Sequence, residues 1–123
     1  MILLDTNAAL WLLTHHLRGV PVLEQRARLY LSPVSVLELK YLMESGRLAL
    51  ARGQALDDIV HDPRWTLDDP GSHQLFQAAL DIGWTRDPFD RLLVAHARTR
   101  RFRLATGDRK LQAHLPSASV IPL

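Results

Sequence analysis

The chain has 123 residues, of which 47% are hydrophobic, and it contains no cysteine. This length and composition predict one globular domain with a substantial core and exclude a disordered chain. The lack of cysteine excludes a disulfide-stapled scaffold and any thiolate metal site, and it favours a reducing, cytoplasmic environment.

The formal net charge of +2 conceals an uneven distribution along the chain. Residues 1–85 carry 7 Lys/Arg and 10 Asp/Glu, a balance of −3, whereas residues 86–110 carry 8 and 3, a balance of +5. A locally basic face points to polyanion binding, although the signal is weak at this total charge.

The beginning of the chain predicts a buried strand followed by a helix. Residues 1–4 form a continuous apolar run, as in a strand covered on both faces. Residues 5–16 follow with leucines at helical spacing. No basic segment precedes them, and the longest apolar run, residues 8–13, is far shorter than the roughly 20 residues of a membrane span. We therefore expect neither a signal peptide nor a membrane anchor, and a soluble protein.

The rest of the chain alternates between predicted strands and helices, with breaks at Pro63 and Pro70. Strands are predicted at residues 29–31, 103–106 and 120–121, and helices at residues 35–46, 55–60, 73–83, 87–100 and 107–114. This alternation predicts an α/β domain with a parallel sheet between helical layers. In such sheets, ligands bind beyond the carboxyl ends of the strands.

Acidic residues stand at these junctions, and each has a structural explanation. Asp5 and Asp108 both follow a predicted strand, and either can cap the next helix by accepting a backbone N–H. Glu38 is the fourth residue of "SVLE", so together with Ser35 it can form a capping box.

A pair of acids, Asp87 and Asp90, brackets the sequence "DPFD". Asp87 before Pro88 is a typical N-cap with proline at the first helical position. Asp90, at the third helical position, would gain only about 0.3–1 kcal/mol from the helix dipole. One acid is enough to cap the helix, so the second calls for another explanation.

Carboxylates at separate strand-to-helix junctions would meet at one edge of the sheet. Several carboxylates that converge repel one another and cannot all stay ionised without a cation. Hard oxygen ligands without cysteine favour Mg²⁺ or Mn²⁺. The pattern therefore predicts a shared site for a divalent metal.

Four segments resemble those of PIN-domain ribonucleases in order and spacing: "LLDTN", "SVLEL", "RDPFDRLLVAHA" and "LATGD". The chain is most similar to VapC-type toxins of bacterial toxin–antitoxin pairs, and the similarity spans nearly all of it. The resemblance implies a PIN-like three-layer α/β/α sandwich with a central, mainly parallel sheet. It also implies cleavage of RNA phosphodiester bonds that depends on Mg²⁺ or Mn²⁺.

The resemblance also implies roles for individual residues. The catalytic and metal-binding acids would be Asp5, Glu38, Asp90 and Asp108. Asp5 and Asp90 would hold the principal ion, and Asp90 is preferred to Asp87 because "DRLLVAHA" matches the family's acid-led helix. Asp87 would then be a cap or a group behind the ligands, and Thr106 would orient Asp108 or its water.

The implied partners are an RNA substrate, a cognate antitoxin that covers the acidic cleft, and a second copy of the chain bound through an apolar helical face. Arg86 and Arg91 flank the acid pair and are the candidates for contact with RNA phosphates. The arginines near the end of that helix, Arg98, Arg100, Arg101 and Arg103, fit a solvated helix C-terminus better. Residues 47–84 depart most from the family pattern, so they do not identify the substrate.

The remaining functional side chains have structural interpretations. His15 and His16 point about 100° apart on a helix and rarely share a metal, and His96 lies among apolar positions. The three tryptophans fit core packing better than base stacking.

Three rival hypotheses stay open. The chain can be a PIN-domain RNA-processing nuclease without an antitoxin, or a degenerate PIN domain that only binds RNA. It can also be a non-enzymatic, receiver-like module of flavodoxin topology that binds metal or phosphate, although no glycine-rich phosphate loop is present.

Overall fold

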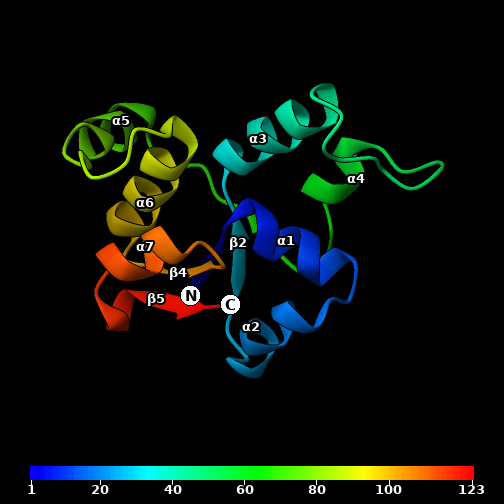
Figure 1. Cartoon of the computed structure of the whole chain (residues 1–123), viewed down its shortest axis with the longest axis horizontal. Coiled ribbons are helices and arrows are strands. Elements are labelled where there is room, and N and C mark those ends of the chain that lie inside the picture. The colour runs from blue at the N-terminus through cyan, green and yellow to red at the C-terminus, as the bar shows by residue number, and fades with distance from the viewer.

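Five parallel strands form the centre of the structure, a computed structural model that describes residues 1–123 (Figure 1). Their order across the sheet is β3-β2-β1-β4-β5, and their bounds are β1 Ile2–Leu4, β2 Leu29–Leu31, β3 Thr66–Leu67, β4 Arg103–Thr106 and β5 Val120–Pro122. The predicted parallel sheet is confirmed. This order differs from the 2-1-3-4-5 order of flavodoxin-like modules, which excludes the receiver-like topology.

Seven α-helices and two short 3₁₀ helices connect the strands. The α-helices are α1 Thr6–Leu13, α2 Val20–Glu24, α3 Pro33–Glu44, α4 Leu56–Val60, α5 Ser72–Leu80, α6 Pro88–Arg100 and α7 Arg109–His114, and the 3₁₀ helices are η1 Leu17–Gly19 and η2 Ser117–Ser119. None of these helices is long and apolar enough to cross a lipid bilayer.

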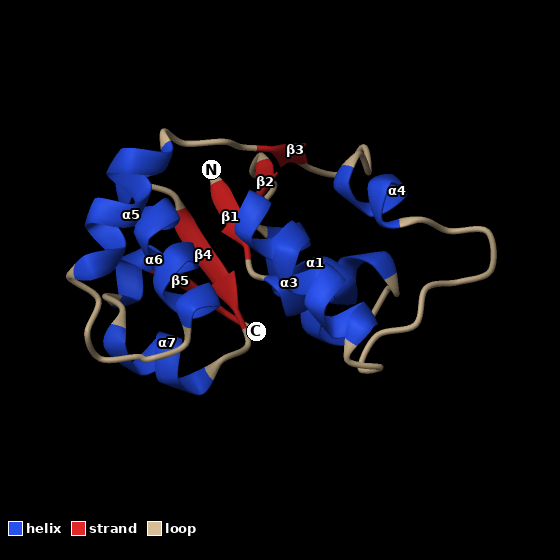
Figure 2. Ribbon diagram, turned by 90° about the horizontal axis from the view of Figure 1, so that it is seen from above, coloured by secondary structure: helices blue, strands red, loops and turns tan.

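Helices cover both faces of the sheet, as Figure 2 shows with α5, α6 and α7 on one side and α1, α3 and α4 on the other. The alternating side chains of β1 enter two separate cores. Leu3 packs in the cluster beneath α5 and α6, whereas Ile2 and Leu4 pack in the cluster beneath α1 and α4. All three side chains are fully buried, as expected for a strand covered on both faces.

The predicted elements are confirmed in position, with shifts at their ends. The first helix ends at Leu13 instead of residue 16, because His15 adopts a left-handed backbone conformation with φ 53°. The third helix begins at Pro33, two residues earlier than predicted, because Ser32 caps it. Two elements were not predicted: α2, which has five residues, and β3, which has two exposed residues.

The strand register places the ends of the central strands side by side. Leu4 of β1 lies opposite Leu31 of β2 and Ala105 of β4. The next residues along these chains are Asp5, Ser32 and Thr106. The sheet therefore brings three strand-to-helix junctions to one edge, where the candidate site lies.

Candidate functional site

A pocket of about 210 Å³ opens at this edge of the sheet. All four acids predicted from the sequence line it, together with Asp87. The complete lining is Asp5, Thr6, Asn7, Glu38, Leu42, Asp87, Asp90, Leu93 and Asp108. The predicted convergence of the four acids is therefore present in the structure. Asp5 and Asp108 also cap helices, as does Asp87, as the sequence indicated.

Asp5 is the most deeply buried of these acids, with 7% of its surface exposed. One carboxylate oxygen accepts a 2.6 Å hydrogen bond from the backbone N–H of Ala8, so Asp5 caps α1. Interactions with the side chain of Thr106 and the backbone N–H of Gly107 also favour its charged form and lower its pKa. Burial nevertheless raises the pKa of Asp5 to about 6, and the nearby charge of Glu38 contributes to the rise.

The predicted capping box between Ser35 and Glu38 is wrong. Ser32 caps α3 instead, by accepting a 3.1 Å hydrogen bond from the backbone N–H of Val34, and both residues of the predicted box lie inside the helix. Glu38 accepts a hydrogen bond from the hydroxyl of Thr6. Burial raises the pKa of Glu38, and the charge of Asp87 raises it further. Glu38 is thus free of capping and faces the pocket.

Thr6 is a member of the site that our sequence interpretation missed. It is buried, lines the pocket, and holds Glu38 by its hydroxyl. Its position directly after Asp5 in "DTN" was the available signal, because the residue after a strand-end acid faces the same crevice.

The cap predicted for Asp87, the first acid of "DPFD", is confirmed. Asp87 caps α6, since one of its oxygens accepts hydrogen bonds from the backbone N–H groups of Phe89 at 2.8 Å and Asp90 at 3.3 Å. The Asp90 side chain takes no part in that cap. The pKa of Asp90 is raised to about 7, and burial is the largest cause. Repulsion from four other acids raises it further: Asp87, Asp108, Glu38 and Asp5.

Asp108 caps α7 by accepting hydrogen bonds from the backbone N–H groups of Lys110 at 2.8 Å and Leu111 at 3.1 Å. Its own backbone N–H donates to the hydroxyl of Thr106 at 3.0 Å. The Thr106 hydroxyl thus accepts from the backbone of Asp108, and the same side chain interacts with the carboxylate of Asp5. This hydrogen bond would be the structural basis for the predicted role of Thr106 in orienting Asp108.

The pocket offers only oxygen donors, which is the chemistry that Mg²⁺ and Mn²⁺ select. Burial raises the pKa of three of its acids, repulsion between the carboxylates raises it further, and a cation would relieve that repulsion. No three of these side chains stand in a ready-made ligand arrangement around one point. The residues thus fit a divalent ion in chemistry, and binding would draw the carboxylates closer together.

The two arginines predicted to contact RNA lie outside this pocket. Arg91 donates to the backbone carbonyl of Leu80 in α5 at 3.4 Å, and its Nε atom is buried without a partner. Arg86 is exposed in the loop before α6. Neither side chain is among the residues that line the acidic pocket.

His96 is a structural residue, as the sequence indicated. It is fully buried, with its ring nitrogens 2.8 Å from the Ser32 hydroxyl and 2.7 Å from the Asp68 carboxylate. His15 and His16 are exposed. Arg100 donates to Asp68 at 2.9 Å and so also has a structural contact.

The tryptophans differ in their surroundings. Trp65 is buried and donates to the backbone carbonyl of Ile59 at 3.0 Å, as core packing predicts. Trp84 stacks on His114, with ring centroids 4.5 Å apart. Trp11 packs against Gly107 beside the acidic pocket.

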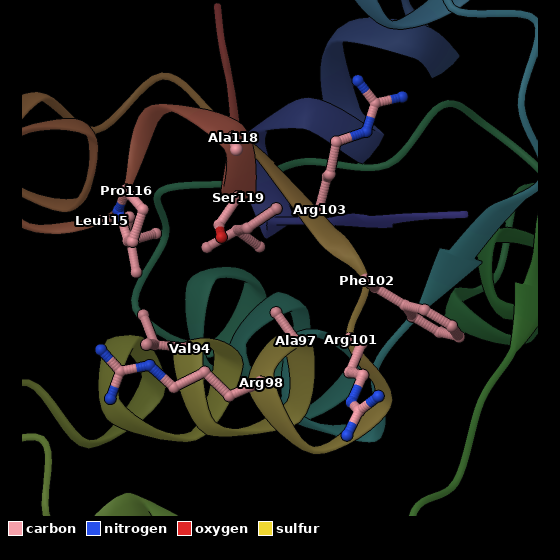
Figure 3. Close-up of a pocket in the computed structure, with 11 residues that line it drawn as sticks. Val94, Ala97, Arg98, Arg101, Phe102, Arg103, Leu115, Pro116, Ala118 and Ser119 are labelled. Carbon is pink, nitrogen blue, oxygen red and sulfur yellow. The ribbon is translucent and has the colours of Figure 1, made fainter.

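A larger cavity of about 320 Å³ lies at the other end of α6, between its C-terminal turn and the segment before β5 (Figure 3). Its floor is apolar, and Arg98, Arg101 and Arg103 are at its rim. Figure 3 shows these three side chains extending in different directions, so their charges do not converge on one ligand. We therefore place the candidate site in the smaller, acidic pocket.

Comparison with known proteins relates the whole chain to one family. The model of the PIN domain matches residues 2–115. No curated protein sequence matches the chain. Among solved structures, a chain of a toxin–antitoxin complex from Klebsiella pneumoniae superposes with a TM-score of 0.72 at 15% identity, covering 98% of this chain and 96% of that one.

Two further structures share the fold. A chain of VapBC2 from Rickettsia felis, bound to a DNA fragment from the promoter, gives a TM-score of 0.70 at 19% identity, with 100% of this chain and 99% of that chain covered. A chain of FitAB bound to a DNA fragment gives a TM-score of 0.58 at 24% identity, with 99% of this chain and 94% of that chain covered. At these identities the likeness establishes the fold.

Proposed function

Because this chain belongs to the PIN domain family, we propose that it is an endoribonuclease that uses Mg²⁺ or Mn²⁺ to hydrolyse RNA phosphodiester bonds. The observation that carries this proposal is the pocket in which Asp5, Glu38, Asp90 and Asp108 meet. The raised pKa values of Asp5 and Asp90 support it, because carboxylates that repel one another are arranged to receive a cation.

We assign Asp5 and Asp90 to the principal ion, with Glu38 and Asp108 completing the site. A divalent ion bound there supplies positive charge that activates water and stabilises charge on the phosphate oxygens. Glu38 accepts a hydrogen bond from the hydroxyl of Thr6, and Asp5 accepts one from the backbone N–H of Ala8, so the two carboxylates keep their orientation. Asp87 keeps the start of α6 in place as its N-cap.

We further propose that the protein is the toxin of a toxin–antitoxin pair. The similar structures from Klebsiella pneumoniae and Rickettsia felis come from a toxin–antitoxin complex and from VapBC2, which supports an antitoxin as partner. An RNA-processing nuclease without an antitoxin is the alternative, and an adjacent small gene for a DNA-binding protein would decide between them.

We propose that two copies of the chain associate through an apolar face formed by α3 and α5. Four large side chains on these helices are exposed to solvent: Leu37 at 63%, Tyr41 at 47%, Phe76 at 58% and Leu80 at 69%. Both helices pack on α6, and Figure 1 shows α5 directly beside it. Large apolar side chains left exposed on helices are typical of protein interfaces.

RNA cleavage tests the proposed activity. Purified protein is incubated with structured RNA in Mn²⁺ or in EDTA, beside the variants Asp5→Asn and Asp90→Asn. We expect cleavage only with the metal, and a loss of about 100-fold or more in each variant, the scale for removing a group that stabilises transition-state charge. Asp81→Asn, an exposed acid at the end of α5, is the matched control. Cleavage that persists in both site variants would refute the assignment.

Arg86 and Arg91, which lie outside the acidic pocket, remain our proposed RNA contacts. Arg86→Gln should raise KM more than it lowers kcat, because a phosphate contact outside the pocket adds binding without touching the reacting atoms. Arg91→Gln should also reduce stability, since Arg91 contacts the carbonyl of Leu80. Cleavage kinetics that are unchanged in Arg86→Gln would argue against its contact with RNA.

A further inference from the structure

The turn that carries Asp108 is in close contact with a tryptophan from α1. A Cβ atom added at Gly107 would lie 2.8 Å from Cζ3 of Trp11 and closer still to Cη2 of the same ring. The backbone of Gly107 does not lie in the left-handed region, so an alanine could adopt its conformation. Position 107 therefore requires glycine, because the Trp11 ring lies so close to the backbone that it leaves no room for a Cβ atom.

Arg18 contacts both members of this pair, because its Nη2 atom would also lie 2.8 Å from a Cβ atom added at Gly107. Its guanidinium carbon lies 4.1 Å from the centroid of the Trp11 ring, a cation–π geometry. Its Nη2 atom donates to the backbone carbonyl of Leu123 at 3.0 Å, and the N–H of Leu123 donates to the carbonyl of Thr106 at 3.0 Å. The ring of Trp11 and the guanidinium of Arg18 thus together fill the space beside Gly107.

The same turn reaches the acidic pocket. The side chain of Thr106 and the backbone N–H of Gly107 interact with the carboxylate of Asp5, and the Thr106 hydroxyl accepts a 3.0 Å hydrogen bond from the N–H of Asp108. A shift of Gly107 would therefore change the position of Asp108 relative to Asp5.

We propose that Trp11 is a positioning residue that presses the turn Thr106–Asp108 against Asp5 and thereby sets the placement of Asp108 in the pocket. We call Trp11, Arg18 and Gly107 the Trp11 brace. The consequence for metal affinity rests on the proposed function, whereas the packing of the brace does not.

A double-mutant cycle tests the brace in the metal-free protein. The readout is the hydrogen-exchange rate of the Asp108 amide, which donates to Thr106. In the natural background Gly107→Ala should speed this exchange about tenfold, because the new Cβ has no room beside the ring. In the Trp11→Ala background the same substitution should change the rate less than about twofold, since the ring is absent and Arg18 can swing away.

Gly83→Ala is the matched control, because a Cβ there meets nothing within 4 Å. Equal acceleration by Gly107→Ala in both backgrounds, or none in either, would overturn the proposal. If Gly107→Ala fails to fold, recovery of folding in the double variant would support the brace, and failure to recover would contradict it.

Mn²⁺ titration of the same four proteins gives a second readout. We expect Gly107→Ala to weaken Mn²⁺ binding roughly 10- to 100-fold, the range for groups that orient metal ligands. If the unmodified protein binds no Mn²⁺, the proposed function fails, but the exchange cycle still decides whether the brace exists.

Discussion

The Nε2 atom of the buried His96 lies 2.7 Å from Oδ2 of Asp68, and this pair joins α6 to the loop after β3. The other ring nitrogen faces the hydroxyl of Ser32, which in turn accepts from the N–H of Val34. A neutral ring with its proton on Nε2 satisfies every partner in this chain. Burial lowers the pKa of His96 despite the adjacent carboxylate, so this neutral form is favoured in the folded protein.

Replacing His96 by leucine should lower the free energy of unfolding by about 2–4 kcal/mol, because it leaves the buried Ser32 hydroxyl proton without an acceptor and leaves the facing Asp68 oxygen only its hydrogen bond from Arg100. The folded-state pKa lies below the ordinary value of 6.5, so the contribution is present above pH 6.5 and decreases as pH falls. Urea unfolding at several pH values measures the difference between the two proteins. A difference that stays constant between pH 5 and pH 8 would contradict the neutral ring.

Asp90→Asn should stabilise the metal-free protein at neutral pH. The folded-state pKa of Asp90 is raised from 3.8 to about 7, so the folded state binds the proton more tightly than the unfolded state does. Stability is therefore highest at low pH and is lost as pH rises through this window. Since Asp90 is half-buried and screened by solvent, we expect a gain of about 1–2 kcal/mol at pH 8 and less at pH 5.

Urea unfolding in EDTA checks this prediction. Asp81→Asn, an exposed acid outside the pocket, should change stability by less than about 0.5 kcal/mol at either pH. An Asp90→Asn protein that is less stable than the unmodified chain at pH 8 would show that the carboxylate is not repelled by its neighbours.

Asp87 and Asp90 should respond differently to substitution. Asp87→Asn keeps an oxygen that can cap α6, so we expect Mn²⁺ affinity to remain within a few-fold, whereas Asp87→Ala should lower stability by about 1 kcal/mol. Asp90→Asn should abolish measurable Mn²⁺ binding at moderate concentrations. Isothermal titration of the variants compares them directly, and a greater loss in Asp87→Asn than in Asp90→Asn would reverse our assignment.

Leu80→Glu should separate the two proposed copies of the chain. Leu80 is 69% exposed on α5, so the substitution should leave the fold intact while placing a charge in the proposed contact. Sedimentation velocity should show a dimer for the unmodified protein and a monomer for the variant. Leu23→Glu, an exposed apolar residue on α2, is the matched control and should leave the dimer unchanged. If the unmodified protein is a monomer, the proposed interface is wrong.

The positions of the acids could be predicted because parallel strands end at one edge of the sheet. Asp5 and Asp108 follow the neighbouring parallel strands β1 and β4. Both acids therefore lie at the same edge of the sheet, whatever the packing of the other side chains. The Ser35–Glu38 capping box was predicted wrongly because Ser32 and Pro33, three residues upstream, offer a better start for the helix. The local sequence pattern does not show which of two serines caps a helix when the position of that helix in the fold determines where it begins.

Other features depend on contacts between distant parts of the chain. Trp11 meets Gly107 only after the sheet has brought β1 and β4 together, and no periodicity in either segment signals that contact. Strand β3 was missed for a related reason: its two residues are exposed and pair only with the edge of β2. Sequence patterns indicate which positions of a single helix or strand are buried. Neither the contact between Trp11 and Gly107 nor a strand of two exposed residues produces such a pattern.

The central claim is that the acidic pocket binds a divalent ion. A crystal soaked in Mn²⁺ and measured at the manganese absorption edge tests it most directly. We predict one anomalous peak within coordinating distance, about 2–2.6 Å, of carboxylate oxygens of Asp5 and Asp90. A structure from such a crystal with no peak in this pocket, or with manganese bound only elsewhere on the molecule, would contradict the account.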